Sequence, residues 1–160
     1  MKVDGVILDL EDSVAPDQKE SARHQIIDGL MQLEWKASSI SVRINATNTE
    51  WCHQDIIELV SSCSEKIATL IVPMVNTPND LVFVETLIKQ LAIKNSSAAE
   101  IGIEGLIETV EGLSNVDKIA QSSEKLEALV LGMGDYAASQ RMRINTIGCL
   151  LYTSDAADDP

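Results

Sequence analysis

The stretch ATLIVPMVNTPNDLVFVETLIKQL (residues 68–91) contains the clearest structural unit of the sequence. It opens with a short apolar run, residues 68–73, which is typical of a buried parallel strand. Thr77 then provides an N-cap hydroxyl, Pro78 a first-turn proline and Asp80 an acid three residues after the cap, and together these indicate a helix start. Apolar residues recur on one face of that helix at Leu81, Val84, Ile88 and Leu91. This pattern predicts one βα unit.

Similar units lie on both sides of this one. The other predicted strands are residues 4–10, 39–44, 101–107 and 127–131. The five strands start at residues 4, 39, 68, 101 and 127, which are 26 to 35 positions apart, and a parallel crossover needs about that length for a helix and two loops. The inward residues of the other predicted helices are Ala22, Ile26, Leu30 and Leu33, then Ile56, Ile57 and Val60 within residues 50–62, then Leu113, Val116, Ile119 and Ala120 within residues 111–122.

Five consecutive βα units fit either an open doubly wound sheet or part of a (β/α)8 barrel. No G-x-G-x-x-G or Walker A motif follows the first strand, which weakens the nucleotide-binding form of the open sheet. Charged side chains follow four of the five strands, and barrel enzymes place active-site groups at these C-terminal strand ends. The polar residues are Asp9, Glu11, Asp12, Arg43, Asn45, Glu108 and Asp135. We therefore predict an α/β fold that is part of a barrel, since a complete barrel takes roughly 250 residues.

The composition argues against several classes of protein. A net charge of −13 argues against nucleic acid and anionic membranes as partners, and no apolar run reaches the roughly 18–20 residues of a membrane span. Cys52, Cys63 and Cys149 lack C-x-x-C spacing, which favours a reducing, cytoplasmic location over a disulfide framework or a zinc site. His24 and His53 have no catalytic partner at useful spacing, and we interpret them as surface residues.

The last twelve residues, CLLYTSDAADDP, break the βα pattern. They resemble the translation of an adaptor used in sequencing libraries, so we expect residues 149–160 to be foreign and residues 1–148 to form the partial barrel domain. The alternative is a genuine acidic terminus.

The segment DGVILDLEDSVAPDQKESAR (residues 4–23) resembles the citrate lyase β-subunit family, also called the HpcH/HpaI aldolase family. Four more motifs follow in the family's order: VRIN at 42–45, VP at 72–73, IET at 107–109 and LGMGDYAA at 131–138. The LEDSV element points to the branch of CoA-thioester lyases. The resemblance implies a (β/α)8 barrel whose first strand and C-terminal units are missing here, and a homo-oligomeric parent protein. Met74 stands where the family usually has Lys.

The resemblance also implies a metal site. Glu108 and Asp135 match the family's metal ligands, and Mg²⁺ is the implied cofactor because it prefers oxygen and takes only one or two protein carboxylates. Judged from spacing alone, a helix cap is the favoured explanation of both carboxylates, and the resemblance shifts the preference to metal ligands.

The remaining roles are assigned in the same way. Arg43 matches a catalytic residue that binds the substrate's carboxylate or oxo group, and the alternative is an internal ion pair with Asp9, Glu11 or Asp12. Glu11 and Asp12 are expected beside the metal or orienting Arg43, while Asp12 and Ser13 also suit a turn or helix cap. Asn45 either binds substrate or shapes its loop.

The predicted function is Mg²⁺-dependent cleavage of a carbon–carbon bond in a hydroxy-acyl-CoA or acyl-carrier-protein thioester, such as a malyl-, citramalyl- or citryl-thioester. One alternative is a class II aldolase that releases pyruvate from a hydroxy-oxo acid and does not need the acids of LEDSV. The other is a truncated product with no function of its own. The general acid/base is expected outside this chain, so we expect these 160 residues alone to be inactive.

Overall fold

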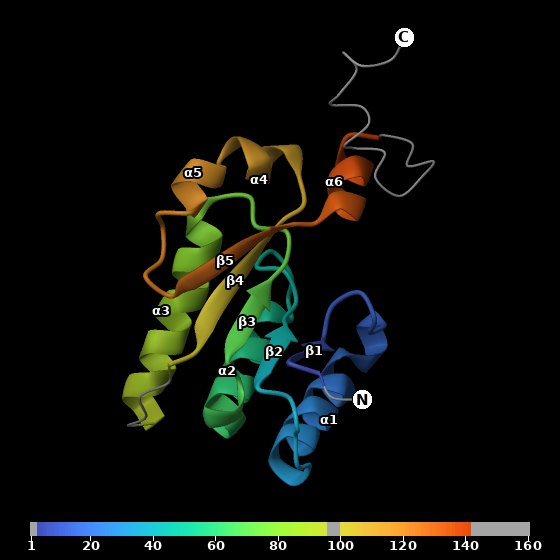
Figure 1. Cartoon of the computed structure of the whole chain (residues 1–160), viewed down its shortest axis with the longest axis vertical. Helices are drawn as coiled ribbons and strands as arrows, with labels where there is room; N and C mark the ends of the chain where they lie inside the picture. Colours follow the sequence, from blue (N-terminus) through green and yellow to red (C-terminus); the bar gives the residue numbers. More distant parts are fainter. Residues whose placement is uncertain (1–2, 96–99, 142–160) are drawn as a thin grey trace.

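The computed structural model describes residues 3–95 and 100–141 of the chain, and its centre is a single parallel sheet. The strands are β1 (Gly5–Asp9), β2 (Ser39–Arg43), β3 (Thr69–Val72), β4 (Gly102–Ile107) and β5 (Leu126–Leu131). They lie side by side in chain order, and every neighbouring pair is parallel (Figure 1). A doubly wound sheet reverses its strand order at a switch point, whereas a barrel adds each strand beside the preceding one. The order therefore matches part of a barrel, and the predicted α/β fold is confirmed.

Three long helices connect the first four strands and lie along one side of the sheet (Figure 1). They are α1 (Lys19–Gln32), α2 (Cys52–Cys63) and α3 (Pro78–Asn95), with single 3-10 turns at Pro16–Gln18 and Ser64–Lys66. Three short helices follow: α4 (Val110–Ser114), α5 (Val116–Ile119) and α6 (Met133–Ser139). None of the described helices is both long enough and apolar enough to cross a membrane.

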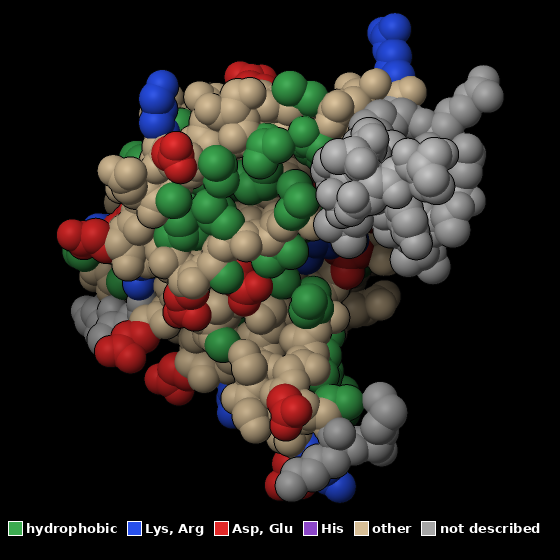
Figure 2. All heavy atoms as spheres, turned by 45° about the horizontal axis from the view of Figure 1, so that its top comes forward, with side chains coloured by type: hydrophobic (Ala, Val, Ile, Leu, Met, Phe, Trp, Pro, Cys, Tyr) green, Lys and Arg blue, Asp and Glu red, His purple; other side chains and the backbone are tan. Residues whose placement is uncertain are grey.

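The core lies between the sheet and these helices. Val42, Leu70 and Ile103 point to the helix side and are fully buried. Ile7 belongs to the opposite face and is 64% exposed, because side chains alternate between the two faces of a strand. Large hydrophobic side chains also remain exposed beyond the C-terminal ends of β4 and β5, at Val110, Leu113, Leu131 and Met133. Figure 2 shows hydrophobic side chains gathered at this end of the molecule.

The start of α3 agrees with the sequence prediction. One oxygen of Asp80 accepts hydrogen bonds from the backbone N–H and the hydroxyl of Thr77, at 2.8 and 3.1 Å. The other oxygen accepts from the Thr47 hydroxyl at 2.6 Å. Asp80 therefore both caps the helix and fastens the loop that follows β2 to the loop that follows β3.

The helix predicted at residues 111–122 is wrong in part. The structure has two short helices, α4 and α5, which are separated at Asn115. The side-chain amide of Asn115 donates to the backbone carbonyl of Asn76 at 2.9 Å, so a tertiary contact holds the break. Ile119 is buried as predicted, but Leu113 is 41% exposed and Ala120 is also exposed.

A buried ionic cluster joins α1, α2 and the loop after β2. Asp55 is fully buried and accepts from Arg23 Nε at 2.9 Å. Its second oxygen accepts from the backbone N–H and the side-chain amide of Asn45, at 3.0 and 2.7 Å. Arg23 is itself buried and also contacts Glu58 at 3.1 Å. The cluster fixes the backbone two residues after Arg43.

Of the described cysteines and histidines, His24 reaches the edge of this cluster, with its Nε2 3.3 Å from Glu58 Oε2. Cys52 and Cys63 are free and buried, and burial raises the pKa of Cys63 to about 11, which makes its thiol unreactive. His24 and His53 are exposed, as expected. Cys149 and the rest of residues 149–160 lie outside the described residues.

Candidate active site

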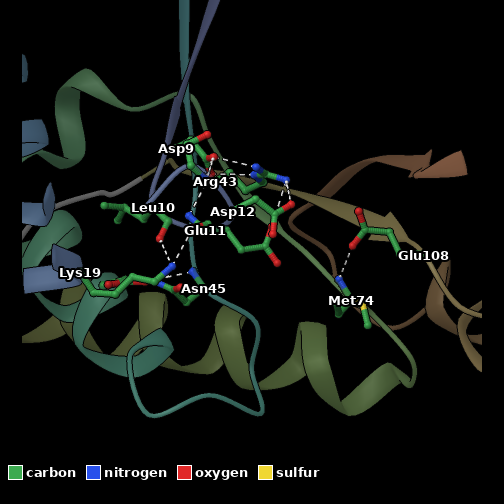
Figure 3. Close-up of polar contacts among 11 residues, drawn as sticks. Asp9, Leu10, Glu11, Asp12, Lys19, Arg43, Asn45, Met74 and Glu108 are labelled. Carbon is green, nitrogen blue, oxygen red and sulfur yellow. Dashed lines mark hydrogen bonds and ion pairs between the residues drawn. The ribbon is translucent and has the colours of Figure 1, made fainter. Parts of the chain in front are cut away.

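The predicted polar residues lie at one end of the sheet. Asp9 and Arg43 are the last residues of β1 and β2, and Glu108 directly follows β4. Met74 follows β3, and Asp135 lies in the first turn of α6, after β5. Figure 3 shows the first four of these at the strand ends, together with the acidic loop of residues 11–12. Parallel strands bring their C-terminal ends to one edge, which explains the grouping.

Arg43 is held by carboxylates on three sides. Its Nε and Nη2 each donate to one oxygen of Asp9 at 2.7 Å, so this pair is bidentate. Its Nη1 lies 3.0 Å from Glu11 Oε2 and 3.5 Å from Asp12 Oδ2 (Figure 3). The internal ion pair that the sequence left as an alternative is therefore present. Burial alone would raise the pKa of Asp9, but hydrogen bonds from Arg43 and from the backbone of Glu11 and Ser13 hold it well below its usual range.

The acidic loop after β1 is fastened by its own backbone. Asp9 accepts from the N–H of Glu11 at 2.9 Å and of Ser13 at 3.1 Å, so Asp9, rather than Asp12, organises this turn. Lys19 is buried, and its Nζ donates to the carbonyls of Leu10 and Glu11, at 2.7 Å each. The same ammonium lies 5.4 Å from the centre of the Trp51 ring, within the range of a cation–π contact. These contacts direct Glu11 and Asp12 toward Arg43.

Glu11 is the carboxylate of this loop with the most strongly raised pKa. Partial burial raises the pKa of Glu11 to about 7, against the lowering effect of Arg43 and with the help of neighbouring Asp12, Glu108 and Asp9. The site thus holds a carboxyl group that can exchange a proton near neutral pH.

We expect the Glu11 carboxyl to titrate with a midpoint near pH 7 in the metal-free chain, well above the usual value of 4.5. Because its pKa is higher in the folded state, the folded chain binds more protons, so this group makes stability rise as the pH is lowered from above 7 toward 4.5. Carbon-13 NMR of labelled glutamate carboxyls, assigned with a Glu11→Gln variant, measures the midpoint. A midpoint near 4.5 would contradict the prediction.

Glu108 is a buried carboxylate with one fixed oxygen. Its side chain is 5% exposed, and Oε2 accepts a hydrogen bond from the backbone N–H of Met74 at 2.8 Å (Figure 3). Burial raises its pKa, the Met74 N–H opposes the rise, and the negative charge of Asp135 adds to it. Among the residues that the structure describes, no cation lies within ion-pair distance of Glu108.

The helix-cap explanation does not fit either predicted metal ligand. The cap of α4 is Thr109, whose hydroxyl accepts from the N–H of Gly112 at 3.0 Å. The N-cap of α6 is Gly132, so Asp135 lies inside that helix and is exposed to solvent. Neither Glu108 nor Asp135 is therefore a helix N-cap.

The donor set at this edge suits a hard divalent cation. Mg²⁺ usually binds one or two protein carboxylates and leaves its other coordination positions to water and substrate. Glu108 and Asp135, which follow consecutive strands, would supply two. Asp9, Glu11 and Asp12 add negative charge, and Arg43 opposes it. No group of three metal-binding side chains occurs within residues 3–95 and 100–141.

Asn45 lies below the site rather than in it. It is buried, and its side-chain amide and backbone N–H both donate to Asp55. The structure thus places Asn45 in the loop-shaping position that the sequence left open, and a contact with substrate stays a prediction.

Sequence reasoning missed three contributors to this site. Lys19 reads as an ordinary exposed helix residue, because lysine is seldom buried. The N–H of Met74 is a backbone group, so the identity of residue 74 does not indicate its role. Gly132 fits closely against Glu108, and its only signal is its place in the LGMGD motif.

Comparison with known proteins identifies the family. The chain is 37% identical over 145 residues to the L-malyl-CoA/beta-methylmalyl-CoA lyase of Rhodobacter capsulatus, covering 91% of this chain and 46% of that protein. It is 30% identical over 141 residues to citrate lyase subunit beta of Escherichia coli, covering 86% and 45%. The chain thus spans about half the length of these curated relatives.

Solved structures share the fold. The magnesium/glyoxylate complex of Haloferax volcanii malate synthase superimposes with a TM-score of 0.75 at 18% identity, covering 87% of this chain and 45% of that one. The sequence pattern of the family described as HpcH/HpaI aldolase/citrate lyase matches residues 1–156. The chain belongs to the HpcH/HpaI aldolase/citrate lyase family.

Proposed function

We propose that the strand-end site described above belongs to a Mg²⁺-dependent lyase that cleaves a carbon–carbon bond in a malyl-, citramalyl- or citryl-type thioester of CoA or an acyl-carrier protein. The observation that carries the proposal is Glu108, a buried carboxylate with no cation at ion-pair distance among the described residues, which lies in the electrostatic field of Asp135 in the first turn of α6. Such a group is costly to keep charged unless a cation joins it.

Glu108 and Asp135 would hold the metal. When bound, Mg²⁺ supplies a Lewis acid that polarises a substrate oxygen and stabilises the negative charge that develops as the bond breaks. The number of protein ligands leaves positions for that oxygen and for water.

Arg43 would bind the acid end of the substrate. Asp9 fixes the guanidinium through Nε and Nη2, while Nη1 carries the longer contacts to Glu11 and Asp12. A substrate carboxylate would compete with these two side chains for Nη1, and charge-assisted hydrogen bonds of this kind are strong. Glu11 would hold or release a proton beside that carboxylate.

Relatives support the substrate class. The lyase and the citrate lyase subunit described above are named for malyl-CoA, beta-methylmalyl-CoA and citrate. The malate synthase was solved with magnesium and glyoxylate.

The test combines binding and turnover. Calorimetry measures Mg²⁺ binding to the chain, and the full gene product is assayed for release of a 2-oxo acid from malyl-, citramalyl- and citryl-CoA, with and without EDTA. We expect cleavage of the carbon–carbon bond in these thioesters, and we expect EDTA to abolish it. Cleavage that is indifferent to EDTA would refute the metal role, and cleavage only of a thioester-free hydroxy-oxo acid would favour the pyruvate-releasing aldolase.

A further inference from the structure

The Glu108 carboxylate is enclosed on two sides by backbone rather than by side chains. On one side the Met74 N–H donates to Oε2 at 2.8 Å. On the other side lies Gly132, which directly follows β5 and is the N-cap of α6, the helix that carries Asp135. Both flanking segments are tied to β4 itself: the N–H of Val75 donates to the carbonyl of Leu106, and the N–H of Gly132 to that of Ile107, each at 3.0 Å.

Met74 has an unusual backbone conformation. Its φ is 53°, in the left-handed region that non-glycine residues seldom adopt. In this conformation the Met74 N–H points at Glu108. The hydrogen bond from the Val75 N–H to the Leu106 carbonyl fixes the turn. Strained backbone of this kind persists where the surrounding contacts hold it, and it is frequent at functional sites.

Glycine is needed at residue 132 because a side chain would lie too close to Glu108, and not because of the backbone conformation. Its φ of −82° and ψ of 84° are open to other residues. A Cβ at this position, however, would lie 2.5 Å from Glu108 Cγ and 2.6 Å from Oε1, closer than any ordinary contact. The bare backbone at residue 132 thus leaves the space in which the second carboxylate oxygen lies.

We propose that the Met74 N–H and the bare backbone of Gly132 act as positioning elements for Glu108, one fixing Oε2 and the other letting Oε1 lie against the turn that leads to Asp135. The clamp brings the two acidic side chains into one binding site for a divalent cation. Its effect on metal affinity rests on the proposed function, whereas its effect on the Glu108 orientation does not.

Two alanine substitutions in the same turn test the clamp. Gly132→Ala places a methyl group against Glu108, while Gly134→Ala is the matched control, because a Cβ there meets nothing within 4 Å. Circular dichroism checks the fold, nitrogen-15 NMR follows the Met74 amide in the metal-free chain, and calorimetry measures Mg²⁺ affinity.

For Gly132→Ala we expect the Met74 amide proton to move upfield and to exchange faster, and Mg²⁺ affinity to fall at least tenfold. For Gly134→Ala we expect the amide signal to stay in place and the affinity to remain within twofold of the parent. A folded Gly132→Ala chain with an unshifted Met74 amide would overturn the clamp. A parent chain that binds no Mg²⁺ would refute the proposed function, while the amide signals would still decide whether the clamp exists.

A second substitution covers the case in which Gly132→Ala does not fold. Replacing Met74 by its α-hydroxy acid analogue turns the amide into an ester, which removes the N–H and keeps the thioether side chain. Met74→Gly is the control, because it keeps the N–H and accepts a positive φ. We expect a tenfold loss of Mg²⁺ affinity for the ester and less than twofold for the glycine. Equal affinities for the two would overturn the role of the N–H.

Discussion

Replacing Glu108 by alanine is expected to lower Mg²⁺ affinity about 100-fold or more and to reduce the cleavage rate of the full gene product by about 10²–10³-fold, the scale of losing a group that stabilises developing charge. The carboxylate is buried, and one of its oxygens is already fixed by the Met74 N–H. Asp135→Ala should act in the same direction and less strongly, since Asp135 is exposed and its position is less constrained.

Two variants make the Glu108 result interpretable. Glu108→Gln preserves the shape and an oxygen that can accept from Met74, so it removes the charge alone and should still lose most of the metal affinity. Glu111→Ala removes an exposed acid from the adjacent helix and should leave both binding and rate unchanged. Calorimetry and steady-state kinetics on the same preparations give both numbers. If the Glu108→Ala and Asp135→Ala chains bind Mg²⁺ like the parent, the metal site is elsewhere.

The strands and long helices were predictable because their signals are local. The apolar run at residues 68–73 lacks polar alternation, which indicates burial on both faces, and all four residues of β3 are buried. The cap and proline before Leu81 fix where α3 starts. The structure shows that the strands pair in chain order, and because all of them are parallel, Glu108 and the turn that leads to Asp135 lie at the same edge of the sheet.

The detailed roles of the polar residues were less predictable because they depend on partners distant in sequence. Arg43 was assigned to the substrate with an internal ion pair as a compatible alternative, and only the structure shows the bidentate contact with Asp9 at 2.7 Å. Asn45 was undecided until Asp55, ten residues later, was seen to accept both of its donors. The residue type determines what a side chain can bind, but the fold determines which partner lies within its reach.

The break at Asn115 illustrates a second limit. Residues 111–122 carry apolar positions at helical spacing, yet the chain bends where Asn115 reaches the carbonyl of Asn76. Leu113 is left on the outside as a result. Here a hydrogen bond from a side-chain amide to a partly buried carbonyl outweighs a weak periodic pattern, since such a bond contributes about 0.5–1.5 kcal/mol.

The second large effect concerns stability. Asp55→Ala is expected to lower the free energy of unfolding by about 3–5 kcal/mol, the usual loss when one partner of a buried ion pair is removed. The substitution leaves Arg23, which is 3% exposed, without its buried partner. It also leaves the backbone N–H and the side-chain amide of Asn45 without their acceptor. Urea denaturation followed by circular dichroism measures the change.

Glu58→Ala is the matched control for this effect, because Glu58 contacts the same guanidinium at 3.1 Å but is 23% exposed. Ion pairs open to solvent contribute about 0–1 kcal/mol, so the two carboxylates of one arginine should differ several-fold in their effect. Since Asn45 lies two residues after Arg43, the Asp55→Ala chain should also hold Arg43 less firmly than the Glu58→Ala chain. Equal losses from both variants would mean that burial around Asp55 contributes nothing, and that the loop after β2 is held by packing of Ile44 and Cys52 alone.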